Sequence, residues 1–168
     1  MIIRKIQEKD NLAVKNVVQQ SLKSLGWDKP GTAYFDPQLD DLYSYYNQGE
    51  DSCYWVVELD GEVVGGVGIA PFADHTQVCE LQKLYLLPKA QGMGIANRLM
   101  ETALAFATQH YKMCYLETLH ELMAASKLYE KFDFILLDEP LSGSEHSAMD
   151  AWYLKDLEEH STEGFEFL

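Results

Sequence analysis

The stretch LYLLPKAQGMGIANRLM, residues 84–100, decides the fold of this chain. It begins with the apolar end of a predicted strand, which Pro88 terminates, and a helix with one apolar face is predicted from Ile95. The turn between them reads Gln91-Gly92-Met93-Gly94-Ile95-Ala96. Because glycine has no side chain, a glycine pair at this point indicates a turn whose backbone another molecule can approach closely.

Three nucleotide-binding interpretations of this turn compete. A P-loop requires Gly-Lys-Ser/Thr at its end, and Ile95-Ala96 does not match it. A Rossmann turn requires a third glycine or alanine where Asn97 stands. The third is an anion site, in which backbone N–H groups and the positive end of the helix dipole bind phosphate or pyrophosphate. A tight turn without a ligand is the alternative, and the glycine pair alone would favour it.

The rest of the chain predicts a mixed domain with the element order β-α-α-β-β-β-α-β-α-β-β. Asp10 and Asp36 are each predicted to cap a helix, the second with Pro37 at its first position, and Asp60-Gly61 predicts a hairpin. The predicted strands are 1–6, 53–59, 62–69, 78–88, 112–119, 134–139 and 149–157; the helices follow residue 10, span 35–48, begin at 95 and span 123–132.

The composition is that of an ordinary globular chain, with 168 residues and 47% hydrophobic residues. We expect one domain over residues 1–157 and an acidic C-terminal tail over 158–168. The start lacks the apolar segment of a signal peptide, and no apolar run is long enough to cross a membrane. Cys53, Cys79 and Cys114 are expected to be reduced and buried, which favours a cytoplasmic protein.

Charge and histidine placement bear on the partners. The formal net charge of −14 argues against a nucleic-acid surface, because neutralising phosphates requires clustered Lys and Arg. The five histidines are scattered without the spacing of metal ligands, so no metal site is expected. We therefore expect neither a nucleic acid nor a membrane as partner.

Two further segments give the glycine turn a family context. The chain resembles the GNAT superfamily, the Gcn5-related N-acetyltransferases, whose pyrophosphate-binding motif Q/R-x-x-G-x-G/A is matched by residues 91–96. The preceding ELQKLYLLP (80–88) resembles the fourth strand of the family, and AASKLYEKFDF (124–134) resembles its A-x-x-L-Y-E-K-x-G-F segment. The order of elements matches the family from about residue 2 to residue 157.

The resemblance implies the acyl-CoA N-acyltransferase fold. This is an α/β (α+β) domain with a single mixed, mostly antiparallel sheet, flanked by helices and splayed between the fourth and fifth strands. Acetyl-CoA would lie in the gap as co-substrate, with its pantetheine arm on the backbone of Leu84 and Leu86. Its pyrophosphate would contact the turn and the residue beside it: Gln91, Gly92, Met93, Gly94, Ile95, Ala96 and Asn97.

The resemblance also implies two catalytic side chains. Glu80, 11 residues before Gln91, matches the position of the catalytic glutamate in the histone-type branch and would be the general base. Tyr129 matches the tyrosine that faces the CoA sulfur and would be the general acid. The Leu84 N–H would stabilise the oxyanion. The alternatives are a Glu80 that pairs with a neighbouring strand and a Tyr129 that only fills the core.

Three expectations concern details of these segments. Strand alternation places Glu80 on the same side as Leu84 and Leu86, unless a bulge shifts it. Asp133 replaces the usual glycine of the later segment, at a position that often needs a left-handed backbone, which Asp tolerates. Leu122 stands where many members have an asparagine near the cofactor arm.

The function implied is acetyl transfer from acetyl-CoA to a primary amine of a small molecule or peptide. A non-catalytic acyl-CoA-binding or sensor module on the same fold is the alternative, and a longer acyl chain is a second one. A homodimer is compatible with the family and with the apolar tail, in which Phe165 and Phe167 could dock on a neighbouring surface.

Overall fold

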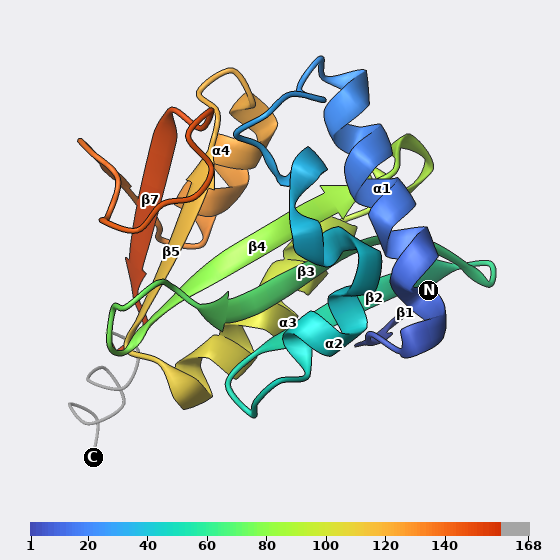
Figure 1. The fold of residues 1–168 in the computed structure, drawn as a ribbon, viewed down its shortest axis with the longest axis horizontal. Coiled ribbons are helices and arrows are strands. Elements are labelled where there is room, and N and C mark those ends of the chain that lie inside the picture. The colour runs from blue at the N-terminus through green and yellow to red at the C-terminus, as the bar shows by residue number, and fades with distance from the viewer. Residues whose placement is uncertain (159–168) are drawn as a thin grey trace.

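The computed structural model describes residues 1–158. Its strands form one seven-stranded sheet in the order β1-β2-β3-β4-β5-β7-β6, and only the β4–β5 pair is parallel (Figure 1). The strands are β1 (Ile2–Lys5), β2 (Cys53–Leu59), β3 (Glu62–Pro71), β4 (Val78–Leu86), β5 (Met113–Thr118), β6 (Ile135–Leu137) and β7 (Ala151–Asp156). The α-helices are α1 (Asn11–Ser24), α2 (Leu42–Tyr46), α3 (Ile95–His110) and α4 (Met123–Lys131). The predicted fold class, a single mixed sheet flanked by helices, is confirmed.

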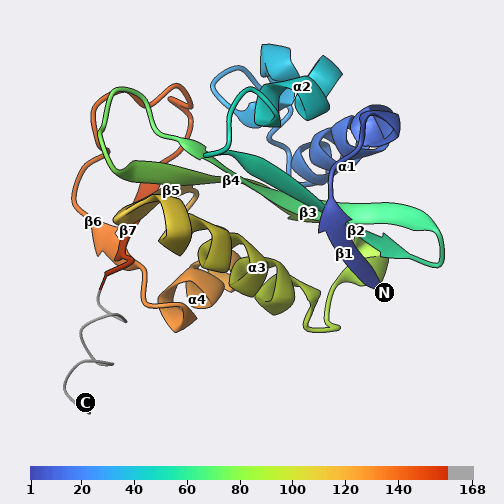
Figure 2. The same cartoon turned by 90° about the horizontal axis from the view of Figure 1, so that it is seen from below.

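The helices cover both faces of the sheet. Figure 2 shows α1 and α2 on one face and α3 and α4 on the other. Each face has its own apolar core: one contains Val18, Leu42 and Tyr54, and the other contains Ile95 and Leu99 of α3. Among residues 1–158, no helix is long and apolar enough to cross a membrane.

The sheet opens between β4 and β5, as predicted. Only Val78–Glu80 of β4 pairs with β5, opposite Met113–Tyr115. Beyond these three pairs the strands diverge, as Figure 1 shows. The rest of β4 therefore has no strand partner on that side.

A β-bulge in β4 changes which side chains share a face. Lys83 has a positive φ of 50°, and the register with β3 shifts between Gln82 and Tyr85. As a result Tyr85 packs against the core under α1 and α2, whereas Leu84 and Leu86 pack against the core under α3. The simple alternation that placed Leu84 and Leu86 beside Glu80 is therefore wrong beyond the bulge.

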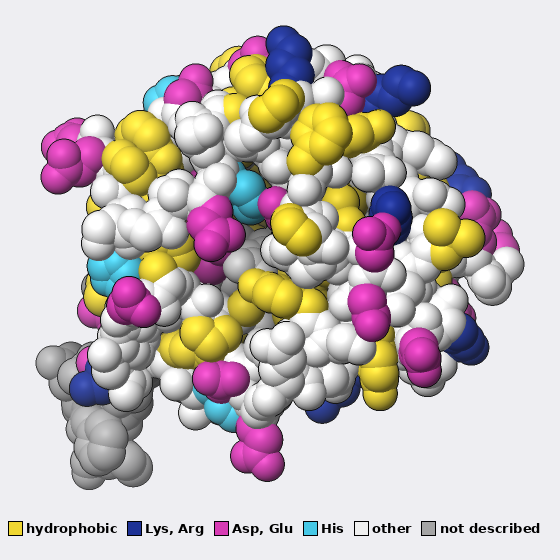
Figure 3. All heavy atoms as spheres, in the orientation of Figure 1, with side chains coloured by type: hydrophobic (Ala, Val, Ile, Leu, Met, Phe, Trp, Pro, Cys, Tyr) yellow, Lys and Arg dark blue, Asp and Glu magenta, His cyan; other side chains and the backbone are white. Residues whose placement is uncertain are grey.

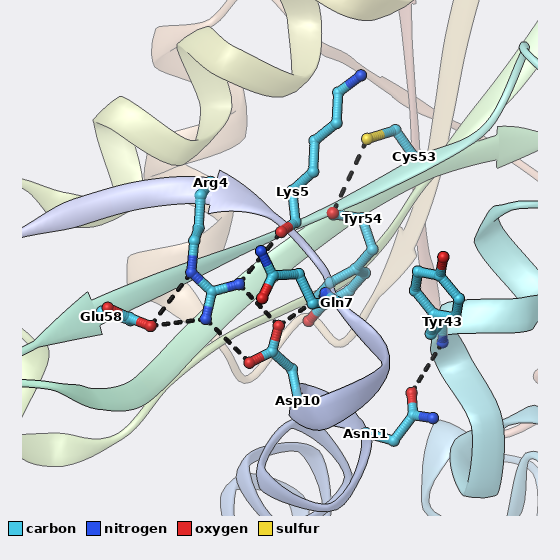
Figure 4. A network of polar contacts seen from close by, with 9 residues as sticks. All are labelled: Arg4, Lys5, Gln7, Asp10, Asn11, Tyr43, Cys53, Tyr54 and Glu58. Carbon is cyan, nitrogen blue, oxygen red and sulfur yellow. Dashed lines mark hydrogen bonds and ion pairs between the residues drawn. The ribbon is translucent and has the colours of Figure 1, made fainter.

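The first predicted helix cap is also wrong in its detail. Helix α1 begins at Asn11, but the Asp10 side chain makes no cap hydrogen bond to it. Its carboxylate instead accepts hydrogen bonds from the Arg4 guanidinium, at 2.7 and 2.9 Å, and from the Gln7 N–H at 2.7 Å. Arg4 also contacts Glu58 at 2.6 Å, so this network joins β1, β2 and the start of α1 (Figure 4).

The single helix predicted over 35–48 is not formed. The segment contains 3₁₀ helices at Ala33–Phe35 and Pro37–Asp41, and then the short α2. Asp36 does not cap with its side chain, because its carboxylate pairs with Lys83 and His146. Asp41 is the residue that caps α2, accepting a hydrogen bond from the Ser44 N–H at 3.1 Å.

Several local predictions are confirmed. Asp60 and Gly61 both have positive φ and form the turn of the β2–β3 hairpin. Asp133 has the left-handed backbone expected of a residue that replaces glycine, with φ of 66°. The cysteines Cys53, Cys79 and Cys114 are free and buried. The predicted tail beyond Glu158, with Phe165 and Phe167, lies outside the described residues.

Candidate active site

The gap between β4 and β5 contains a cavity of about 670 Å³. Its walls come from the ends of both strands, the C-terminal part of α1, the β5–α4 connection and the start of α4. The lining residues include Ser21, Leu84, Leu86, Gln91, Glu117 and Tyr129. The opening of the sheet thus produces a cavity that both strands line.

The glycine turn lies directly after β4. Gly92 and Gly94 have φ of 77° and 74°, and a side chain at either position would meet no protein atom within 4 Å. Glycine is therefore required by the backbone conformation and not by crowding. The Gln91 side chain donates a hydrogen bond to the Leu86 carbonyl at 3.1 Å, which ties the turn to the strand end.

The residues around the two glycines divide into anchors and exposed groups. Ile95 is buried in the core under α3, whereas Met93 is 57% exposed. Ala96, half-buried, follows Ile95 in the first turn of α3. The Asn97 side chain accepts a hydrogen bond from Lys131 of α4 at 2.7 Å. The turn is therefore anchored to the protein through Ile95 and Asn97, while Met93 is exposed to solvent. The backbone N–H groups at the start of helix α3 lie in this turn.

Glu80 lies on β4 before the opening of the sheet and does not line the large cavity. It lines a small pocket of about 90 Å³, together with Tyr45, Gln82 and His146. The side chain is only 9% exposed, and Gln82 donates a hydrogen bond to its Oε1 at 2.6 Å. Burial raises the pKa of Glu80 to about 7, and the negative charge of Glu117 adds to the rise while Gln82 opposes it.

Tyr129 lies on α4 and lines the large cavity. Its ring is buried, 6.1 Å from Phe134 and 5.8 Å from Tyr153 between ring centroids. Burial raises the pKa of the Tyr129 phenol, so the hydroxyl keeps its proton throughout the neutral range. Tyr129 is thus both a core tyrosine and a residue of the cavity wall.

A family comparison matches this arrangement. The model of the Acetyltransferase (GNAT) family matches residues 20–134, which include β4, the glycine turn and α4. The chain belongs to the GNAT family of acetyltransferases. An uncharacterized N-acetyltransferase of Escherichia coli K12, YjgM, is 40% identical over 160 residues, covering 93% of this chain and 95% of that relative. The N-acetylaspartate synthetase of Homo sapiens is 38% identical over 95 residues, but these cover 56% of this chain and only 31% of the relative.

Solved GNAT structures share the fold. An acetyltransferase of the GNAT family from Staphylococcus aureus Mu50 has a TM-score of 0.80 with 17% identity, covering 93% of this chain and 98% of the other. An acetyltransferase from Salmonella typhimurium, yncA, solved with its cofactor acetyl-CoA, has a TM-score of 0.74 with 17% identity and 95% coverage of both chains. At this identity the likeness concerns the fold alone.

Two departures from the GNAT pattern are now located. Leu122, at the position where many members have an asparagine, lines the cavity between β5 and α4. Asp133 supports the turn after α4 without a glycine. Among residues 1–158, no cluster of three or more His, Cys, Asp or Glu side chains could hold a metal ion.

Two polar cavity residues of this GNAT chain were not predicted from sequence. Within the described residues, Ser21 Oγ and Glu117 Oε1 are buried side-chain oxygens without a hydrogen-bond partner, and both residues line the large cavity. An acidic residue near the end of the predicted strand 112–119, where the sheet was expected to open, was the signal that could have identified Glu117.

Proposed function

We propose that this GNAT chain transfers an acetyl group from acetyl-CoA to a primary amine. The observation that carries the proposal is the cavity in the β4–β5 gap, which extends from Gln91 at the glycine turn to Tyr129 and Glu117. Acetyl-CoA carries its thioester at the end of a long pantetheine arm. It therefore needs a passage with an anion site at one end and an acceptor site at the other.

The cofactor end rests on backbone groups. The β4 edge that β5 leaves unpaired at Leu84 and Leu86 offers N–H and C=O groups to the amides of pantetheine. The pyrophosphate would lie against the turn from Gln91 to Ala96, beside Asn97, where the exposed N–H groups at the start of α3 attract an anion. Because the turn is held by Gln91 and by the buried Ile95, little ordering is required on binding.

Glu80 is proposed as the general base. An alkyl ammonium has a pKa of ~10.4, so almost none of the acceptor is a nucleophile at neutral pH without help. A carboxylate whose pKa is raised to about 7 takes up a proton more readily than an ordinary one and is still half ionised near pH 7. Glu80 is on the α1–α2 side of the sheet, since Gln82 beside it accepts a hydrogen bond from Tyr46 of α2.

Tyr129 is proposed as the proton donor to the leaving sulfur. It belongs to the core on the α3 side, so the amine and the thiolate would approach and leave on opposite sides of the reacting carbonyl. The ammonium gives one proton to Glu80, directly or through a water molecule, and its nitrogen then bonds to the carbonyl carbon while the Leu84 N–H stabilises the oxyanion. The C–S bond breaks with its electron pair on sulfur, and sulfur takes the Tyr129 proton. The nitrogen loses a second proton to water, water returns a proton to the tyrosinate, and Glu80 releases its proton to water.

The acceptor is proposed to be a small molecule or peptide with a primary amine, and the reaction is proposed to need no metal. The names of the relatives, N-acetyltransferase and N-acetylaspartate synthetase, support amine acetylation. The same names do not favour a non-catalytic acyl-CoA-binding module. Such a module would also not need Glu80 and Tyr129 as proton acceptor and donor.

An acceptor screen tests this function. The protein is incubated with acetyl-CoA carrying a ¹³C-labelled acetyl group and a panel of primary amines and short peptides. Free CoA thiol is measured together with labelled product by mass spectrometry. We expect at least one amine to be acetylated in equal amount to the thiol released. Thiol release without acetylated amine, or no release with any amine although acetyl-CoA binds, would overturn the proposal.

A further inference from the structure

We propose that Glu117 binds the ammonium group of the acceptor, so that this enzyme selects cationic primary amines over neutral compounds of the same shape. The proposal rests on the proposed function, because it assigns the acceptor end of the same cavity. It is carried by an unpaired carboxylate oxygen, by the face of the sheet on which Glu117 lies and by the charges around it.

The carboxylate of Glu117 is held at one oxygen and free at the other. Its Oε2 accepts a hydrogen bond from the Tyr115 hydroxyl at 2.8 Å, and that hydroxyl in turn accepts one from the Leu141 N–H at 3.3 Å. Its Oε1 is buried and has no partner among residues 1–158. A buried polar atom without a partner destabilises the fold, more so when it is charged, and a ligand N–H at this position would offset that cost.

The register of the sheet places Glu117 on the acceptor side. Tyr115 is the partner of Glu80 in the last β4–β5 pair, so the two side chains share a face of the sheet. Glu117 lies two residues further along β5 and points to this same face, beyond the point where the strands separate. Tyr129 and Leu84 belong to the core of the other face. Glu117 therefore faces the same side of the sheet as the proposed base, whereas Tyr129 belongs to the other side.

The charges of the cavity favour a cation. Lys83 contributes to the wall, but its ammonium lies 2.8 Å from Asp36 and its side chain is only 2% exposed. Glu121 also lines the cavity, and its carboxylate accepts a hydrogen bond from the indole N–H of Trp27. Among the described lining residues, Glu117 has the buried carboxylate oxygen without a partner, whereas Glu121 is exposed. Ser21 on α1 adds a neutral polar atom without a partner, which can hydrogen-bond a second group of the acceptor.

Binding at Glu117 and deprotonation by Glu80 are separate steps. A nearby anion favours the ammonium form, so Glu117 should contribute mainly to binding and little to the rate once the acceptor is bound. Its charge also contributes to the raised pKa of Glu80. Removing the charge should therefore raise the KM for the amine and lower the pKa seen on the acidic side of the pH–rate profile.

Binding of three matched probes tests the proposal without requiring turnover. The affinities of n-pentylamine, 1-pentanol and pentanoate for the protein saturated with CoA are measured by NMR titration. For the wild-type chain we expect the amine to bind at least about tenfold more tightly than the alcohol, as for one hydrogen bond to a charged group. In Glu117→Gln, which keeps the shape and can still accept from Tyr115, this preference should fall to about threefold or less.

Two variants serve as controls. Glu130→Gln removes the same charge from the exposed face of α4 and should leave the preference unchanged. Glu121→Gln tests the other acidic residue of the wall. A wild-type chain without preference for the amine, or a preference lost in Glu121→Gln and kept in Glu117→Gln, would overturn the proposal. If the preference follows Glu117 but no amine is acetylated, the ammonium site stands and the proposed acetyl transfer is wrong.

Discussion

The two proposed catalytic side chains are both buried, and burial changes the proton affinity of each in the same direction. It raises the pKa of Glu80 to about 7, which makes the carboxylate a stronger base. It also raises the pKa of Tyr129, which keeps the phenol protonated but reduces its tendency to give the proton away. At the scale of single residues, Glu80 is therefore the better matched of the two to its proposed role.

Replacing Glu80 with glutamine should slow acetylation at pH 7 by about 100- to 10,000-fold, because the amide cannot accept the proton. The affinity for acetyl-CoA, measured by calorimetry, should not change. Since the pKa of Glu80 is near 7, the wild-type rate should rise with pH up to about this value, and the variant should lack that rise. Raising the pH toward the pKa of the amine should restore part of the variant's rate. A variant with full rate at pH 7, with chemistry rate-limiting, would leave Glu80 a structural role only.

The same raised pKa has a consequence for stability. The folded chain binds the Glu80 proton more tightly than the unfolded chain does, so this group stabilises the fold below its unfolded pKa of ~4.3. That stabilisation is lost as the pH rises through about 7. Thermal unfolding should therefore show Glu80→Gln gaining stability relative to wild type between pH 5 and pH 8. An equal difference at both pH values would contradict the raised pKa.

Replacing Tyr129 with phenylalanine should lower kcat by about 10- to 30-fold, less than the roughly 100- to 10,000-fold typical of general acid help, since a thiolate leaves readily. The dissociation constant of CoA and the melting temperature should change little, because the ring contacts with Phe134 and Tyr153 remain. An unchanged kcat, with chemistry rate-limiting, would show that the thiolate leaves without Tyr129. A large loss of melting temperature with unchanged kcat would instead assign the hydroxyl to the core.

The positions of Glu80 and Tyr129 could be predicted from the sequence better than their surroundings could. Glu80 and Tyr129 stand at fixed distances from recognisable segments, so their elements could be predicted before their surroundings were known. Contacts between distant parts of the chain could not be predicted. Asp36 pairs with Lys83, 47 positions away, and Ser21 and Glu117 line the same cavity only because the fold brings them together. The Asp10 and Asp36 caps failed for the same reason, since a charged partner competes for the carboxylate more strongly than a helix N–H does.

At the scale of elements, the β4 bulge places side chains on faces of the sheet that strand alternation alone would not give them. The bulge at Lys83 sends Leu84 and Leu86 to one face of the sheet while Glu80 stays on the other. The long strand and the following helix were predictable from periodicity, but the bulge was not, because Lys83 is not a residue type that marks a positive φ. The glycines of the turn were predictable, since few other residues accept such backbone angles.

Replacing Gly94 with valine should abolish CoA binding, because φ of 74° is strained for a branched residue and the side chain would stand where the pyrophosphate is proposed. Gly61→Val is a matched control, since Gly61 has φ of 79° and equally open surroundings, but lies in the β2–β3 hairpin. Both variants should lose stability to a similar extent. Calorimetry should show lost CoA affinity only for Gly94→Val, and an unchanged affinity there would contradict the proposed anion site.

At the scale of the whole molecule, a buried ionic cluster joins three distant segments near the proposed site. Lys83 of β4 lies 2.8 Å from Asp36, and His146 of the β6–β7 connection lies 2.9 Å from the same carboxylate. Burial lowers the pKa of His146, but the hydrogen bond and charge of Asp36 outweigh it, so its pKa is raised overall. Acidic side chains are otherwise dispersed over the face in Figure 3, in keeping with the net charge of −14.

Lys83→Met should destabilise the fold by about 3–5 kcal/mol, because it leaves Asp36 buried with one partner fewer. The comparison is Lys89→Met, which removes an ion pair with Glu62 in which both side chains are more than half exposed. That change should cost about 0–1 kcal/mol. Denaturant unfolding measures both, and equal losses would mean that the cluster around Asp36 contributes no more than a surface pair.

The central claim is that acetyl-CoA occupies the β4–β5 gap with its pyrophosphate on the glycine turn, and a crystal structure of the complex tests it most directly. We predict pyrophosphate oxygens at hydrogen-bond distance, about 2.7–3.2 Å, from backbone N–H groups within Gln91–Ala96. The pantetheine should pair with β4 at Leu84 and Leu86, and the sulfur should face the Tyr129 hydroxyl. A cofactor bound outside the gap, or a pyrophosphate away from the turn, would contradict the account.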